Sequence, residues 1–149
     1  GAVRNSKKIS RQILSSRKKR DINTTSDLVE LLKPLAPFRY QEKFLAQIFQ
    51  AIRIEVNNEI EVLKSFLEQA TKSLKTGGRI VCISYHSLED RCVKRYIRFG
   101  NFEGNDEKDF YGNSLRVLRN IGRVVVPSEK EIKINKRARS AKMRIAEKI

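Results

Sequence analysis

The chain has 149 residues, of which 40% are hydrophobic and 33% charged, and this length suits one domain with a buried core. No apolar run approaches the roughly 20 residues that a membrane-spanning helix needs, so the sequence predicts neither an integral membrane protein nor a membrane partner. The formal net charge is +15 and the pI about 10.2, which indicates a polyanionic partner such as nucleic acid. The alternative is a lysine-rich surface that only contacts solvent.

The first residues are strongly basic and helical in pattern. Residues 1–20 contain eight cations and no acid, and residues 4–18 predict a helix with a thin apolar edge. Thr24 and Asp27 have the spacing of a capping box that begins a second, short helix. Pro34 and Pro37 end that helix. The basic run is a candidate RNA contact, formed by Arg17, Lys18, Lys19 and Arg20.

The strongest periodic pattern runs from Leu45 to Leu74, where apolar residues recur every three or four positions. It predicts a long helix that stops at Gly77-Gly78, with a kink or break at Asn57-Asn58. Arg53 and Asn57 lie on a polar edge beside the apolar face. That edge could line a pocket or simply face solvent.

Residues 79–85 form a short apolar segment, which is typical of a strand buried on both faces of a parallel sheet. Ser87 and Asp90 fit an N-cap pair that begins a helix ending at Gly100. Helix, strand and helix together predict an α/β, doubly wound fold. The only two cysteines, Cys82 and Cys92, are expected to be reduced core thiols of a cytoplasmic protein, and no metal site is expected.

Residues 100–122 are rich in Gly, Asn and charge and predict a long loop. A strand at 123–126, a short helix capped by Ser128 and Glu131, and a half-buried strand at 141–146 follow. No glycine-rich turn of the G-x-G type follows a strand, so no nucleotide cradle is expected in this chain. With one buried strand and two edge-like strands, the chain is expected to be the later part of a longer protein. Two further basic blocks occupy residues 91–98 and 130–149.

Several long strings resemble the RsmH family, the ribosomal RNA small-subunit methyltransferases H, formerly called MraW. They are Phe49–Asn57 (FQAIRIEVN), Gly77-Gly78-Arg79, Ile83–Arg91 (ISYHSLEDR) and Arg137–Lys148 (RARSAKMRIAEK), in this order. The stretches at 101–104 (NFEG) and 108–112 (KDFYG) resemble the Bacteroidetes branch of the family.

The resemblance implies a class I (Rossmann-like) S-adenosyl-L-methionine-dependent methyltransferase that modifies N4 of a cytidine in small-subunit rRNA. Residues 1–42 would end its helical inserted domain, and residues 43–149 would form the C-terminal half of its catalytic domain. The family's cofactor-binding motifs precede the residues present here, so no cofactor-binding residue is expected in the chain. The chain by itself is expected to be inactive, and its incomplete sheet predicts self-association as a dimer.

Ligands of doubly wound folds bind at the carboxyl ends of strands, which selects Tyr85, His86 and Ser87. His86 and Asp90 are candidates for a catalytic role, although no catalytic base is assigned. The substrate or RNA candidates are Arg53, Asn57, Tyr85, His86, Ser87, Arg91, Arg137, Arg139, Arg17, Lys18, Lys19 and Arg20. Two other functions remain open: a non-catalytic basic RNA-binding module, and a structural half-domain that folds only with a partner segment.

Overall fold

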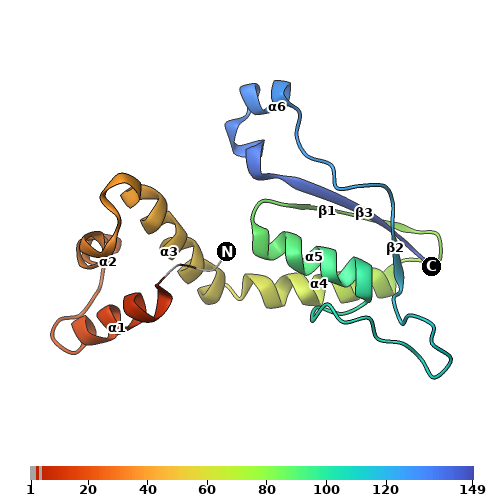
Figure 1. The fold of residues 1–149 in the computed structure, drawn as a ribbon, viewed down its shortest axis with the longest axis horizontal. Coiled ribbons are helices and arrows are strands. Elements are labelled where there is room, and N and C mark those ends of the chain that lie inside the picture. The colour runs from red at the N-terminus through yellow and green to blue at the C-terminus, as the bar shows by residue number, and fades with distance from the viewer. Residues whose placement is uncertain (1–2, 4) are drawn as a thin grey trace. The chain divides into compact units, whose positions relative to one another are not determined.

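The computed structural model describes residue 3 and residues 5–149, so Arg4 of the basic start lies outside the described residues. Helices and a small sheet combine into a mixed α/β structure (Figure 1). It divides into two compact units, residues 1–57 and residues 58–149. No described helix combines the length and the apolar character needed to cross a membrane.

The first unit contains α1 (Ser6–Arg17), α2 (Thr25–Leu32) and α3 (Gln41–Val56), with 3₁₀ turns at Lys33–Leu35 and Phe38–Tyr40. Its core is a small cluster in which Ile9, Leu32 and Ile48 are buried, one from each helix. The predicted capping box of α2 is confirmed. The Asp27 N–H donates to Thr24 Oγ1 at 3.1 Å, and the Thr24 N–H donates to Asp27 Oδ2 at 2.9 Å.

The periodic segment from Leu45 to Leu74 forms two helices, so the predicted break is confirmed. α3 ends at Val56 and α4 (Glu59–Ser73) begins two residues beyond Asn57. Asn58 has a φ of 51°, in the left-handed region that ends helices and that Asn adopts more readily than most residues. The apolar repeat of the sequence continues through the break between the two helices.

The second unit contains α4, β1 (Arg79–Ser84), α5 (Ser87–Phe99), β2 (Leu118–Asn120), α6 (Glu129–Ile134), a 3₁₀ turn (Lys136–Ser140) and β3 (Lys142–Lys148). The strands form an antiparallel sheet in the order β1-β3-β2. Arg79 pairs with Glu147 and Ser84 with Lys142, while Leu118 pairs with Lys148. The expected parallel pairing is therefore not present among these strands.

The expected strand at 123–126 was wrong in position. The regular strand β2 lies earlier, inside the expected loop. Of residues 123–126, only Val125 pairs with another strand, through an isolated bridge to Met143. The two predictions that follow it are confirmed, because the Ser128 side chain caps α6 and residues 142–148 form β3. β2 is short and has no apolar run that would mark it as a strand in the sequence. It forms a strand through its backbone pairing with β3.

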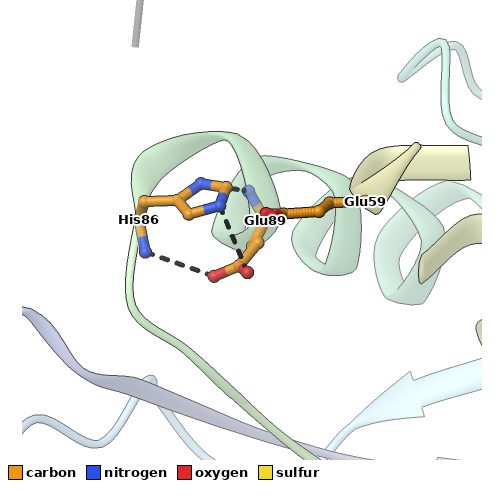
Figure 2. Close-up of side chains that lie close together, drawn as sticks. All are labelled: Glu59, His86 and Glu89. Carbon is orange, nitrogen blue, oxygen red and sulfur yellow. Dashed lines mark hydrogen bonds and ion pairs between the residues drawn. The ribbon is translucent and has the colours of Figure 1, made fainter. Parts of the chain in front are cut away.

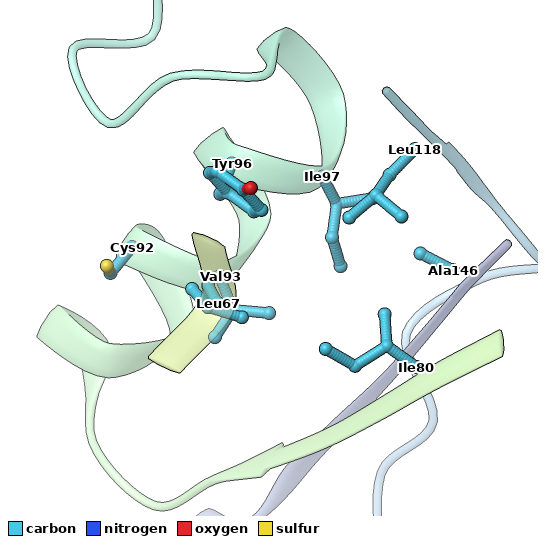
Figure 3. Packing of buried hydrophobic residues seen from close by; sticks show 8 residues of the cluster. All are labelled: Leu67, Ile80, Cys92, Val93, Tyr96, Ile97, Leu118 and Ala146. Atoms are coloured by element: carbon cyan, nitrogen blue, oxygen red, sulfur yellow. The ribbon is translucent and has the colours of Figure 1, made fainter. Parts of the chain in front are cut away.

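One face of the sheet packs against α5, and α5 packs against α4 (Figure 1). Figure 3 shows Ile80, Ile97 and Leu118 pointing into the space between α5 and the strands. Each aliphatic side chain buried there contributes about 1.5–3 kcal/mol to stability. The remaining members of the buried cluster are Leu67, Cys92, Val93, Tyr96 and Ala146. Both cysteines are free, and burial raises the pKa of each thiol.

The opposite face of the sheet is largely uncovered within the described residues of this unit, although residues 125–127 and Glu131 border it near Ile83. No described strand pairs with the outer edge of β1. Val81 is 56% and Ile83 58% exposed, so the expectation of a strand buried on both faces is not met within them. Met143 exchanges both of its backbone hydrogen bonds with Val125, on the β2 side. Because hydrogen bonding alternates along an antiparallel strand, the N–H and C=O groups of Val81 and Ile83 point away from β3.

Candidate functional site at the end of strand β1

The candidate site is the short connection between β1 and α5. The Ser84 hydroxyl, at the buried end of β1, donates to the Lys142 carbonyl at 3.4 Å. Tyr85 follows with 58% of its surface exposed. α5 then begins at Ser87, so an exposed aromatic ring lies between a fixed strand and a fixed helix.

A capping box at the start of α5 holds this connection. His86 is the N-cap, and its Nδ1 accepts from the Glu89 N–H at 3.3 Å. Glu89 Oε2 accepts from the N–H groups of Tyr85 at 2.9 Å and His86 at 3.3 Å. The predicted pairing of Ser87 with Asp90 is therefore shifted by one residue. Both pairs have the same spacing, but the Asp90 carboxylate is bound elsewhere.

Figure 2 shows the His86 ring beside Glu89, and Glu59 reaches toward the same place from α4. Since Nδ1 accepts a hydrogen bond, the proton of the neutral ring is on Nε2, which lies 3.2 Å from Glu89 Oε1. The His86 side chain is only 11% exposed. The hydrogen bond that Nδ1 accepts from the Glu89 N–H orients the ring, while the buried Nε2 has no hydrogen-bond partner among the described residues.

Glu59, His86 and Glu89 could also be considered as metal ligands, because one potential ligand atom of each lies within 4.8 Å of the other two. Binding an ion through Nε2 would require that nitrogen to lose its proton and Nδ1 to give up the Glu89 N–H. In the observed arrangement Nδ1 keeps its hydrogen bond from the Glu89 N–H, which is not compatible with an ion bound through Nε2.

Asp90 is bound to β3 rather than to the start of α5. Arg144 donates to it through Nε at 2.8 Å and Nη2 at 3.2 Å, and Lys142 Nζ lies at 3.4 Å. Burial by itself raises the pKa of the Asp90 carboxyl, but the hydrogen bonds and charges of Arg144 and Lys142 outweigh it and lower the pKa below its usual value. The carboxylate thus joins α5 to the sheet.

The other candidates near this site are exposed cations. Arg91 is on α5 and lines a hollow of about 390 Å³ with Cys92 and Arg95. Arg137 and Arg139 lie in the 3₁₀ turn before β3, and β3 starts opposite Ser84. Both arginines therefore lie in the chain just before the end of β3 that pairs with the last residue of β1, which Tyr85 follows.

The structure does not bring all candidates together. Arg53 is on α3 and Asn57 is its C-cap, both in the first unit. The run of Arg17, Lys18, Lys19 and Arg20 ends α1 in that unit and is exposed. Arg20 donates to Asp27 at 3.2 Å, so part of its charge is neutralised inside the unit.

Sequence reasoning missed a second group of cations, which lines a cavity of about 570 Å³ in the second unit. Arg116 and Arg123 come from the segment expected to be a plain loop and strand, and Arg144 from β3. The signals were the basic block at residues 91–98, which includes Lys94 and Arg98, and the block at residues 130–149, which includes Arg144.

The glycines of the described residues lie away from the turn that follows β1. Gly77 and Gly78 precede β1, Gly100 packs against Arg116, and no glycine-rich turn follows a strand. The turn that does follow β1 carries Tyr85 and His86 instead.

The model of the MraW methylase family matches residues 1–149. Ribosomal RNA small subunit methyltransferase H of Flavobacterium johnsoniae is 56% identical over 149 residues, which is all of this chain and 49% of the relative. The proteins of the same name from Christiangramia forsetii and Bacteroides thetaiotaomicron are 55% and 49% identical, over 99% of this chain and 49% of each relative. The chain spans about half the length of these curated relatives.

Proposed function

Because the chain belongs to the MraW methylase family, we propose that it is the part of a ribosomal RNA methyltransferase that presents the target base and binds the surrounding RNA. The proposed reaction transfers a methyl group from S-adenosyl-L-methionine to N4 of a cytidine in small-subunit rRNA. The observation that carries the proposal is the family match over all 149 residues. The relatives' shared name, ribosomal RNA small subunit methyltransferase H, supports the substrate class.

In this proposal residues outside the present chain provide most of the cofactor site. We assign residues 1–42 to the end of a helical inserted domain and residues 43–149 to a Rossmann-like catalytic domain. The helical first unit agrees with the former in character, but it extends further, to residue 57. The outer edge of β1 is unpaired in the described residues, and the side chains of Val81 and Ile83 are exposed. Both features support the catalytic-domain assignment, because further strands and helices of a Rossmann-like sheet would cover them. A cytoplasmic location follows from the ribosomal substrate.

The chemistry of the proposed site is positioning of the base. An exocyclic amine attacks only when its ring is held in place and out of any base stack. Tyr85 offers an exposed ring face for stacking, while the contacts of His86 and Glu89 fix the backbone that carries it. Tyr85 is thus the proposed stacking residue and His86 a positioning residue.

A tyrosine variant series tests the proposed function in the intact protein. Stacking of a base on an aromatic ring contributes about 1–3 kcal/mol, so Tyr85→Ala is expected to lower kcat/KM for rRNA methylation roughly 5- to 150-fold. Tyr85→Phe keeps the ring and is expected to retain most activity. The assay measures transfer of labelled methyl groups from S-adenosyl-L-methionine to small-subunit RNA.

Tyr111→Ala is the matched control, because Tyr111 is 85% exposed in the same unit but lies far along the chain from β1. It is expected to leave kcat/KM unchanged. Failure of the wild-type protein to methylate small-subunit RNA would contradict the proposed function itself. Equal activity of Tyr85→Ala and wild type would contradict only the stacking role.

The alternative of a non-catalytic RNA-binding module is supported by the net charge of +15 and by the lack of a cofactor cradle in these residues. It predicts RNA binding without methyl transfer, even in the intact protein. The same labelled-methyl assay, combined with an RNA binding measurement, therefore separates the two functions.

The basic end of α1 is a proposed RNA contact. Since Arg20 pairs with Asp27, the variant replaces only Arg17, Lys18 and Lys19 with Ser. RNA affinity is expected to fall, and the slope of log affinity against log salt to flatten by about 0.7–0.9 for each phosphate that the variant no longer neutralises. Replacement of the exposed Lys72, Lys75 and Lys133 with Ser is the control with the same charge change. Equal slopes in both variants would mean that this run only contacts solvent.

A further inference from the structure

We propose that the basic cavity of the second unit is a phosphate-binding subsite for single-stranded RNA. We define the basic cavity as the hollow of about 570 Å³ between α5, β3 and the segment from Arg116 to Val124. The inference rests on the proposed function, because RNA is the proposed substrate. It adds a site that neither the motif at the end of β1 nor the family match assigns.

Five cations line the basic cavity, and no acidic residue does. They come from three parts of the chain: Lys94 and Arg98 from α5, Arg116 and Arg123 from the following segment, and Arg144 from β3. Arg144 is held by Asp90. The other four make no ion pair with any residue that the structure describes.

On the opposite face of the same sheet, the positive charges are paired with a carboxylate of the chain itself. There Arg79 and Arg119 both bind Glu147, at 3.1 Å and 2.6 Å. In the basic cavity Asp90 offsets only the charge of Arg144, so the other four cations repel one another, and an incoming anion removes that repulsion. The charge is therefore arranged for a ligand rather than for internal pairing.

Close packing holds the cations around the cavity. A Cβ added at Gly100 would lie 3.1 Å from the Arg116 Cα and 3.3 Å from the Leu115 carbonyl, so only glycine lets this segment approach the end of α5. The Ile121 N–H donates to the Ile145 carbonyl at 2.9 Å, which fixes the segment that carries Arg123 against β3. Arg98 lies with its guanidinium carbon 5.0 Å from the centroid of the Phe99 ring.

The lining favours a nucleic acid strand over a small anion. Ile121, Val124 and Ile145 give the cavity an apolar part, and Asn120 adds an amide. A lone phosphate would use only the cations, whereas a nucleotide unit also offers a sugar and a base to apolar and amide groups. Guanidinium groups bind phosphate oxygens in a bidentate manner, and three arginines here have no carboxylate partner in the described residues.

The test uses the intact protein with Arg98, Arg116 and Arg123 replaced together by Gln. Affinity for a short single-stranded RNA that contains the target cytidine is expected to fall roughly tenfold to a hundredfold at physiological salt. The slope of log affinity against log salt is expected to flatten by about 0.7 for each phosphate that is no longer neutralised. The control replaces Lys72, Lys75 and Lys133 by Gln and is expected to keep the wild-type slope.

A chemical readout on the wild-type protein keeps the proposal testable if the triple variant folds poorly. The RNA is expected to protect Arg98, Arg116 and Arg123 from an arginine-modifying reagent, and inorganic phosphate at the same concentration is not. Equal protection by inorganic phosphate would overturn the RNA assignment in favour of a small-anion site. Protection by a polyglutamate peptide but not by RNA would overturn it in favour of an acidic protein.

The failures of the two proposals are distinguishable. Wild-type salt slope in the triple variant, together with full methyl transfer, would overturn the subsite and leave the proposed function standing. RNA binding that depends on the three arginines, without methyl transfer by the intact protein, would support the subsite and favour the RNA-binding module instead.

Discussion

Replacing Asp90 with alanine in the intact protein is expected to lower the free energy of unfolding by about 3–5 kcal/mol. Asp90 is only 8% exposed and is bound by Arg144 through two hydrogen bonds. The variant leaves the guanidinium of Arg144, 15% exposed, without its carboxylate partner. Urea unfolding at neutral pH, followed by circular dichroism, measures the loss.

The control for this prediction is a double-mutant cycle. If the loss comes from the unpaired guanidinium, Asp90→Ala combined with Arg144→Met is expected to cost much less than the two single losses added together. Additive losses would mean that the two side chains act independently. They would also mean that α5 is not joined to β3 through this pair.

The same carboxylate predicts how stability depends on pH. The contacts of Arg144 and Lys142 lower the pKa of Asp90 in the folded state below its value in the unfolded chain, which is about 3.9. Its contribution is therefore fully present above the unfolded pKa and is lost as the pH falls through the folded pKa. Wild type is expected to lose stability more steeply than Asp90→Ala below about pH 4, and parallel curves would contradict the prediction.

The 149-residue chain studied alone is expected to self-associate through the outer edge of β1. The backbone groups of Val81 and Ile83 point away from β3, and their side chains are 56% and 58% exposed on the uncovered face. Such an edge pairs readily with another strand, and a second copy of β1 is the most similar strand available. Light scattering at increasing concentration is expected to show a shift from monomer to dimer.

Charges on this edge are expected to prevent the dimer. Val81→Lys with Ile83→Lys places two cations at the pairing strand and leaves the core on the other face intact, so the variant is expected to remain monomeric. The control is Val62→Lys, an exposed apolar residue on α4 that lies away from the sheet edge. A strictly monomeric wild-type chain would contradict the prediction and would favour an independent RNA-binding module.

Patterns that depend on near neighbours could be predicted from the sequence. The helix break at Asn57-Asn58, the capping box of Thr24 and the end of α5 at Gly100 follow from residues a few positions apart. β1 could be found because six consecutive residues have strand character, and Tyr85 and His86 follow directly at its end. The exposure of the basic run at the end of α1 could be predicted from its composition alone, because four consecutive cations are seldom buried.

Features that depend on distant partners could not be predicted. Ser87–Asp90 and His86–Glu89 have the same spacing, and the choice between them rests on Arg144, 54 residues further along, binding Asp90. β2 was missed because Leu118–Asn120 becomes a strand only through its pairing with β3. The pairing of β3 with β1 and β2 is antiparallel, and it leaves one face of β1 exposed.

The sequence by itself determined the family, the basic character, the helices and the location of a candidate site after β1. These properties are local or additive, so the order and spacing of residues contain them. Only the tertiary structure decided that the Asp90 carboxylate binds β3 and that cations from Lys94 to Arg144 surround one cavity. Strand pairing and helix packing set these distances, and they bring together residues whose separation along the chain carries no signal of proximity.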